Sequence, residues 1–136
     1  MNWEECKLKN FVKESKVDVE LVKSLLKESE KKLITDNFSP LNKDTCSTKI
    51  TLNYDSLREV LEAVALKNGF KIYNHDCFTG FLKEVLKLDK ESFEFNRFRL
   101  IRNSINYYGK SISLDNAQKI LDDIKKLRNK LIKDLS

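Results

Sequence analysis

Apolar residues recur at three- and four-residue intervals along almost the whole chain, a spacing that predicts helices. Residues 18–36, for example, place Val22, Leu25, Leu26 and Leu33 on one helical face. Because such a face must be covered by other helices, the pattern predicts an all-α fold, an up-and-down bundle of four to five main helices plus short helices. The other helices are expected over residues 3–14, from about 49–54 to 68, from about 74 or 75, over about 90–108, and from 113 onward.

Polar and glycine-containing stretches separate these helices. Residues 37–49, NFSPLNKDTCSTK, collect Asn, Ser, Thr, Asp and the single Pro, and predict the longest loop. Gly69 is placed as a left-handed cap of the helix before it, the helix over about 90–108 is expected to stop at Gly109, and Ser113 is placed to cap the last helix. The β-branched TKITL (48–52) could instead open as a strand, but no second strand is apparent to pair with it, so a helix is predicted.

The stretch YNHDCFTGFLKEVLKL predicts the fourth helix. Either Asn74 or Asp76 could cap its start, since both side chains accept hydrogen bonds from backbone N–H groups there. The helix is expected to bury four apolar side chains: Phe78, Phe81, Leu82 and Val85.

Composition indicates one domain over residues 1–136. The net charge of +5 is compatible with a polyanionic partner, although solvated lysine-rich helices reach such values alone. Cys6, Cys46 and Cys77 are odd in number and widely spaced, which predicts unpaired thiols, no zinc site and a reducing cytoplasm. No leader-like or membrane-spanning apolar run is present, so we expect a soluble protein without membrane association.

One fourteen-residue stretch, RFRLIRNSINYYGK (97–110), carries four cations, two asparagines and two tyrosines without an acid. On a helix, Arg102 lies at the border between the apolar stripe and a polar stripe that includes Arg99 and Asn106. A partly desolvated arginine there suits a phosphate or a carboxylate, so an ion pair with one of the glutamates is the alternative. The tyrosines could stack bases or serve as core or interface residues. The candidate nucleic-acid-binding residues are Arg97, Arg99, Arg102, Asn106, Tyr108 and Lys110.

The chain resembles the HEPN superfamily of small helical domains over about Asp18 to Leu131. The resemblance is carried by YDSLREVLEAVALKNGFKIYNHDCFTGFLKE, followed by FRLIRNSINYYGKSIS. The similarity is greatest to an archaeal-looking branch whose late helix has an Arg-Asn start and a Tyr-Tyr-Gly end. The resemblance implies a homodimer, often acting with a nucleotidyltransferase partner in toxin–antitoxin pairs or defence. Many members are metal-independent RNA endonucleases whose motif is an Arg, often an Asn after it, and a later His.

Arg102 and Asn103 match the opening of that motif, but Tyr107, Tyr108 and Gly109 occupy the positions where the histidine should fall. Tyrosine titrates near 10 and histidine near 6.5, so tyrosine is a poor proton-transfer group at neutral pH. We therefore expect a non-catalytic module that acts through dimerisation and binding of RNA or a nucleotidyltransferase. The alternative is a divergent RNA endonuclease that uses Arg102, Asn103 and Tyr107 across a dimer, and a third possibility is docking of an acidic protein.

Other polar residues change this picture little. His75, the single histidine, is interpreted as a turn or helix-start residue. Asp55, Arg58 and Glu59 could pair with the Arg102 region or form a solvated face. No phosphate-binding glycine loop, nucleophile elbow or metal-ligand cluster is present, so neither a cofactor nor a metal is predicted.

Overall fold

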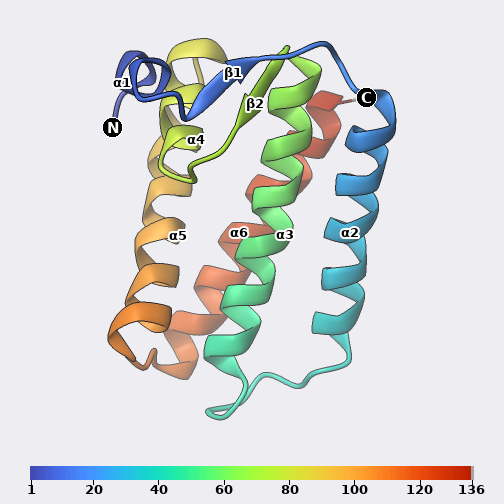
Figure 1. Ribbon diagram of the computed structural model, residues 1–136. Helices are drawn as coiled ribbons and strands as arrows, with labels where there is room; N and C mark the ends of the chain where they lie inside the picture. Colours follow the sequence, from blue (N-terminus) through green and yellow to red (C-terminus); the bar gives the residue numbers. More distant parts are fainter. Residues whose placement is uncertain (136) are drawn as a thin grey trace.

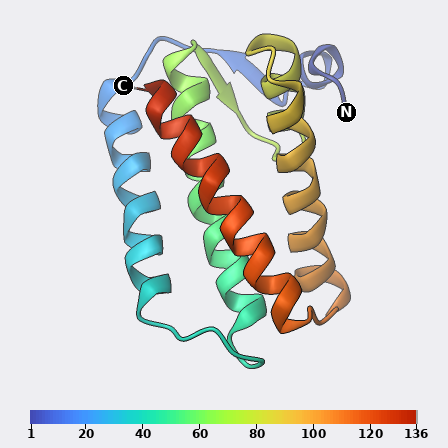
Figure 2. The ribbon, with the colours of Figure 1, turned by 180° about the vertical axis from the view of Figure 1, so that it is seen from behind.

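The computed structural model describes residues 1–135, and it confirms the predicted all-α bundle. Its long helices are α2 (Val19–Asn37), α3 (Cys46–Lys67), α5 (Asp89–Tyr108) and α6 (Leu114–Leu135). Consecutive long helices run in opposite directions, and α6 covers the back of α3 (Figures 1 and 2). No helix within residues 1–135 is both long enough and apolar enough to span a membrane.

Helix α3 is the centre of the bundle and is buried from its first turn to its last. It packs against α2, α5 and α6, because its apolar positions surround the helix rather than forming one stripe. Tyr54 of α3 meets Phe95 of α5 in a stacked ring pair, with ring centroids 5.6 Å apart. Phe78 closes the same aromatic cluster, so α3 and α5 are held at a fixed separation.

The prediction of a helix over residues 3–14 is wrong for the second half of that range. Helix α1 (Trp3–Leu8) stops early, Asn10 adopts a left-handed φ of 61°, and Val12–Glu14 forms strand β1. This strand pairs antiparallel with β2 (Phe70–Ile72), which begins directly after Gly69. The helix at TKITL is confirmed, since α3 already begins at Cys46 and shortens the predicted loop 37–49.

The start of the fourth helix also differs from the prediction. The Asn74 side chain accepts a hydrogen bond from the Asp76 N–H at 2.9 Å and forms a turn, so α4 (Cys77–Gly80) begins later. The chain then widens into a π-helical turn, η1 (Phe81–Val85). Phe78, Phe81 and Leu82 are buried as predicted, and Val85 is half-buried.

The predicted ends of the later helices are confirmed. Gly109 has a left-handed φ of 60° after α5, and Gly69 has a φ of 86° after α3. The Ser113 hydroxyl accepts a hydrogen bond from the Asn116 N–H at the start of α6. These signals are local, so no tertiary contact was needed to find them.

The prediction of unpaired cysteines is wrong for two of the three. Cys6 of α1 and Cys77 of α4 form a disulfide, with their Cα atoms 5.9 Å apart, and Cys46 is free and buried. Sequence spacing could not reveal the pair, because 71 residues separate the two cysteines. The disulfide joins helix α1 to the start of α4.

Helix α1 packs so closely on α4 that Gly80 cannot carry a side chain. A Cβ there would lie 2.9 Å from the Trp3 backbone nitrogen. We expect Gly80→Ala to lower the free energy of unfolding by about 1–3 kcal/mol, because overpacking forces the backbone to shift. The buried Trp3 is the single tryptophan, so its fluorescence emission should also move to longer wavelength.

Gly109→Ala is the matched control for Gly80→Ala. It strains a left-handed cap at the far end of α5, where no atom lies within 4 Å of the new Cβ. It should lower stability without moving the Trp3 emission. Equal emission spectra for wild type and Gly80→Ala would contradict the predicted displacement of α1.

Candidate functional site

Arg99 and Arg102 lie one helical turn apart on α5 and face α3 and the segment of residues 74–76. The guanidinium carbon of Arg102 lies 5.7 Å from the centre of the Tyr54 ring and 6.0 Å from that of Tyr107. Such cation–π contacts stabilise a guanidinium that is partly removed from water. Arg102 is half-buried, as the border position in the sequence predicted.

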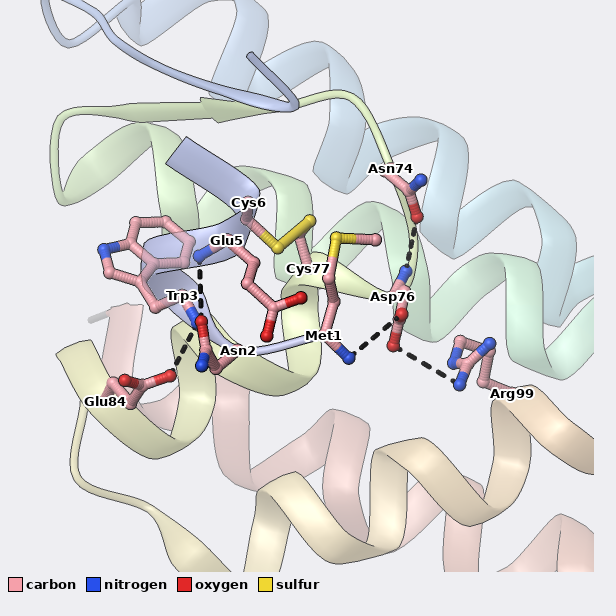
Figure 3. The surroundings of a disulfide bond; sticks show 10 residues. All are labelled: Met1, Asn2, Trp3, Glu5, Cys6, Asn74, Asp76, Cys77, Glu84 and Arg99. Carbon is pink, nitrogen blue, oxygen red and sulfur yellow. Dashed lines mark hydrogen bonds and ion pairs between the residues drawn. A yellow bond between two sulfur atoms is a disulfide. The ribbon is translucent and has the colours of Figure 1, made fainter. Parts of the chain in front are cut away.

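Arg99 has partial partners in the same region. One of its nitrogens lies 3.4 Å from an Asp76 carboxylate oxygen and donates a hydrogen bond to the Asn96 side chain. Asp76 is itself shared, because the Met1 ammonium lies 3.3 Å from its other oxygen (Figure 3). Asp76 therefore does not fully neutralise Arg99.

Arg58 of α3 completes a cluster of three arginines, Arg58, Arg99 and Arg102, which we call the arginine cluster. Arg58 pairs with Glu62 one turn later on α3. Within residues 1–135, no carboxylate forms an ion pair with Arg102. The Nε atoms of all three arginines are buried and lack a hydrogen-bond partner. Because buried donors are normally satisfied, the unpaired Nε atoms mark the arginine cluster as the candidate anion site.

Tyr54 and His75 lie beside the arginine cluster as neutral groups. The Tyr54 hydroxyl is 3.4 Å from His75 Nδ1. Burial raises the pKa of the Tyr54 hydroxyl above its usual value, although Arg102 and Arg99 oppose the shift. Burial, assisted by the three neighbouring arginines, lowers the pKa of His75 to about 4. At neutral pH neither group therefore adds charge to the arginine cluster, whose positive charge is that of its three guanidinium groups.

Some of the other predicted binding residues lie away from the arginine cluster. Arg97 points to the α6 side of α5, where it pairs with Asp123 at 2.9 Å and lies over the Phe98 ring. Arg97 is separated from Arg99 by helical geometry, since residues two apart lie on nearly opposite faces of a helix. Asn103 is half-buried, and the remaining candidates are exposed at the end of α5 and just beyond it: Asn106, Tyr107, Tyr108 and Lys110.

The sequence did not predict that His75 lies beside Arg102, and for Arg58 it allowed either a place near Arg102 or one on a solvated face. Of the three polar residues weighed on α3, Arg58 joins the Arg102 region, whereas Glu59 lies 2.5 Å from Lys32 of α2. His75 is 27 positions from Arg102, so neither helical spacing nor a local motif connects them. A search of family models and a search of curated proteins both found no match to this chain.

Proposed function

We propose that this protein is a HEPN-like helical module that binds RNA through the arginine cluster. The observation that carries the proposal is Arg102, a half-buried guanidinium held against two tyrosine rings without a carboxylate partner among residues 1–135. Arginine forks match phosphate oxygens, and the RNA backbone presents a phosphate at every nucleotide. The half-satisfied Arg99 and Arg58 beside it allow more than one phosphate contact.

The exposed face of α5 supports association with a second copy. Phe93, Leu100 and Tyr107 are spaced seven residues apart, so they fall along one face of the helix. Their side chains are 75, 51 and 69% exposed. A two-fold dimer on this stripe would place the Tyr107 ring of each copy at the interface, and each ring lies 6.0 Å from the Arg102 guanidinium of its own chain. A homodimer is therefore part of the proposal.

Binding without cleavage is the favoured mode. The motif histidine is replaced by Tyr107, Tyr108 and Gly109, and His75 is half-buried with its pKa lowered to about 4. Neither tyrosine nor such a histidine is matched to proton transfer near neutral pH. The endonuclease alternative with Arg102, Asn103 and Tyr107 is retained as an outcome of the test below.

The resemblance to the HEPN superfamily also leads to three further predictions. These are a nucleotidyltransferase partner, a toxin–antitoxin or defence setting, and an archaeal source. A cytoplasmic location also stays a prediction. The Cys6–Cys77 disulfide weighs against that location, because disulfides persist mainly in oxidising compartments.

We expect Arg102→Ala to weaken binding of single-stranded RNA about 10- to 100-fold, the cost of losing charged hydrogen bonds to phosphate. The slope of the logarithm of the binding constant against the logarithm of the salt concentration should also fall by about one, the value for one lost phosphate contact. Arg97→Ala is the matched control, because it removes the same charge from the same helix on the side that faces Asp123. Fluorescence anisotropy of labelled RNA over a salt series measures both quantities.

Equal losses in Arg97→Ala and Arg102→Ala would show that net charge alone is responsible, and would contradict the proposed site. Absence of RNA binding by wild type would refute the proposed function. The same samples, incubated with EDTA and separated on a denaturing gel, test the alternative. Cleavage that disappears in Arg102→Ala would establish the endonuclease in place of the binding module.

A further inference from the structure

The two-stranded sheet carries a lysine pair around an exposed tyrosine. Lys13 of β1 and Lys71 of β2 are directly opposite each other in the antiparallel register. Their ammonium groups lie 5.8 and 5.7 Å from the centre of the Tyr73 ring, which is 55% exposed. We call Lys13, Lys71 and Tyr73 the tyrosine platform.

The tyrosine platform holds two positive charges that no carboxylate of residues 1–135 neutralises through an ion pair. Like charges directly opposite each other on paired strands destabilise a sheet. The Tyr73 ring compensates in part, since its face attracts cations. A bound polyanion would relieve the repulsion, and an aromatic ligand could stack on the ring.

A hollow of about 350 Å³ lies beside the tyrosine platform. Its apolar wall includes Leu25 of α2, Leu66 of α3 and Ile72 of β2, and its rim includes Glu62 and Tyr73. Apolar hollows with a few polar groups at the rim suit flat organic rings. A nucleobase satisfies this description, because it is planar and carries hydrogen-bonding groups only at its edges.

The hollow and the arginine cluster are neighbours. Glu62 lines the hollow and also pairs with Arg58 of the cluster. Tyr73 is two residues from His75, so their Cα atoms are at most about 7 Å apart. In Figure 1 the chain leaves β2 and descends between α3 and α5, the two helices that carry the arginine cluster.

We propose that the tyrosine platform is a second contact for the same RNA strand, with one base stacked on Tyr73 and backbone phosphates at Lys13 and Lys71. This inference rests on the proposed function. It favours RNA over an acidic protein, because an exposed ring beside two cations and next to an apolar hollow combines base stacking with phosphate neutralisation. The strand would run from the arginine cluster over residues 73–75 to the sheet.

The test compares Tyr73→Ala with Tyr73→Phe on strands of about four and about twelve nucleotides, the range covered by single-strand binding modules. Tyr73→Ala should weaken binding of the longer strand about 5- to 100-fold, as expected for one lost stacking contact. Tyr73→Phe keeps the ring and should bind like wild type. Arg102→Ala should weaken binding of both strands.

A second pair of variants tests the charges. Lys13→Gln combined with Lys71→Gln should weaken binding of the longer strand and lower its salt dependence. The charge-matched control is Lys126→Gln combined with Lys133→Gln, two exposed positions on α6 at the back of the bundle (Figure 2). This control should reduce binding far less.

The outcomes separate this inference from the function on which it rests. Loss of binding in Arg102→Ala with no loss in Tyr73→Ala would overturn the tyrosine platform and leave the RNA-binding proposal intact. Equal loss in Tyr73→Phe and Tyr73→Ala would overturn base stacking. Displacement of bound RNA by polyglutamate from wild type and Tyr73→Ala alike would overturn the platform in favour of an acidic protein ligand. No RNA binding by wild type would remove both proposals.

Discussion

Replacing Asp36 with alanine should lower the free energy of unfolding by about 3–5 kcal/mol, the cost of breaking a buried ion pair from one side. The Asp36 side chain, at the end of α2, is 1% exposed. Its carboxylate lies 2.9 Å from the ammonium of Lys49 in α3 and 3.5 Å from that of Lys125 in α6. Removal of the carboxylate leaves Lys49 as a buried charge without its counterion.

Lys49 cannot easily move to the solvent when its counterion is removed. Its ammonium donates hydrogen bonds to the backbone oxygens of Asp36 and Ser39, both at 2.7 Å, and these bonds hold it in the interior. The network joins three long helices at one end of the bundle. Lys125 is more exposed, so Lys125→Gln should cost less than about 1 kcal/mol and serves as the control.

Urea denaturation followed by circular dichroism measures the Asp36 effect. A double variant, Asp36→Leu with Lys49→Met, should recover much of the loss, because apolar residues of similar volume can replace a buried pair. A loss below about 1 kcal/mol for Asp36→Ala would show that water reaches Lys49 and would contradict the prediction.

Removal of the Cys6–Cys77 disulfide is the second large effect. We expect the variant with Cys6→Ser and Cys77→Ser to lose about 2–4 kcal/mol, because the bond closes a long loop and restricts the unfolded chain. Both cysteines are fully buried, so the serine hydroxyls would also need new partners. Without the bond, α1 depends mainly on its packing and on contacts such as the Trp3 N–H to Glu84 hydrogen bond of 2.7 Å (Figure 3).

Denaturation with and without reductant isolates this contribution. Wild type should become less stable in reductant, whereas the double variant should not respond. Cys46→Ser is the control, since Cys46 is buried and outside the disulfide, and it should keep the response to reductant. Three reactive thiols in unreduced, denatured wild type would show that the bond does not form.

Features that arise from local backbone preferences could be predicted from the residues alone. Apolar spacing predicted α2, α3, α5 and α6 as long helices, and Gly109 and Ser113 marked where one ends and the next begins. Caps and periodicity act within about one turn of the residue concerned, so they can be recognised without a fold. The border position of Arg102 followed from the same spacing.

Contacts between residues that are distant in the sequence could not be predicted in this way. Strands β1 and β2 are three residues long, too short for a clear alternating pattern, and each is ordered by the other across more than fifty residues. The disulfide depends on the close packing of α1 against Gly80. Arg58 and His75 join Arg102 because α3, the 74–76 turn and α5 pack together, whereas Arg97 is turned to Asp123. Periodicity fixes the face on which a side chain lies, but its neighbours are set by the packing of the whole chain.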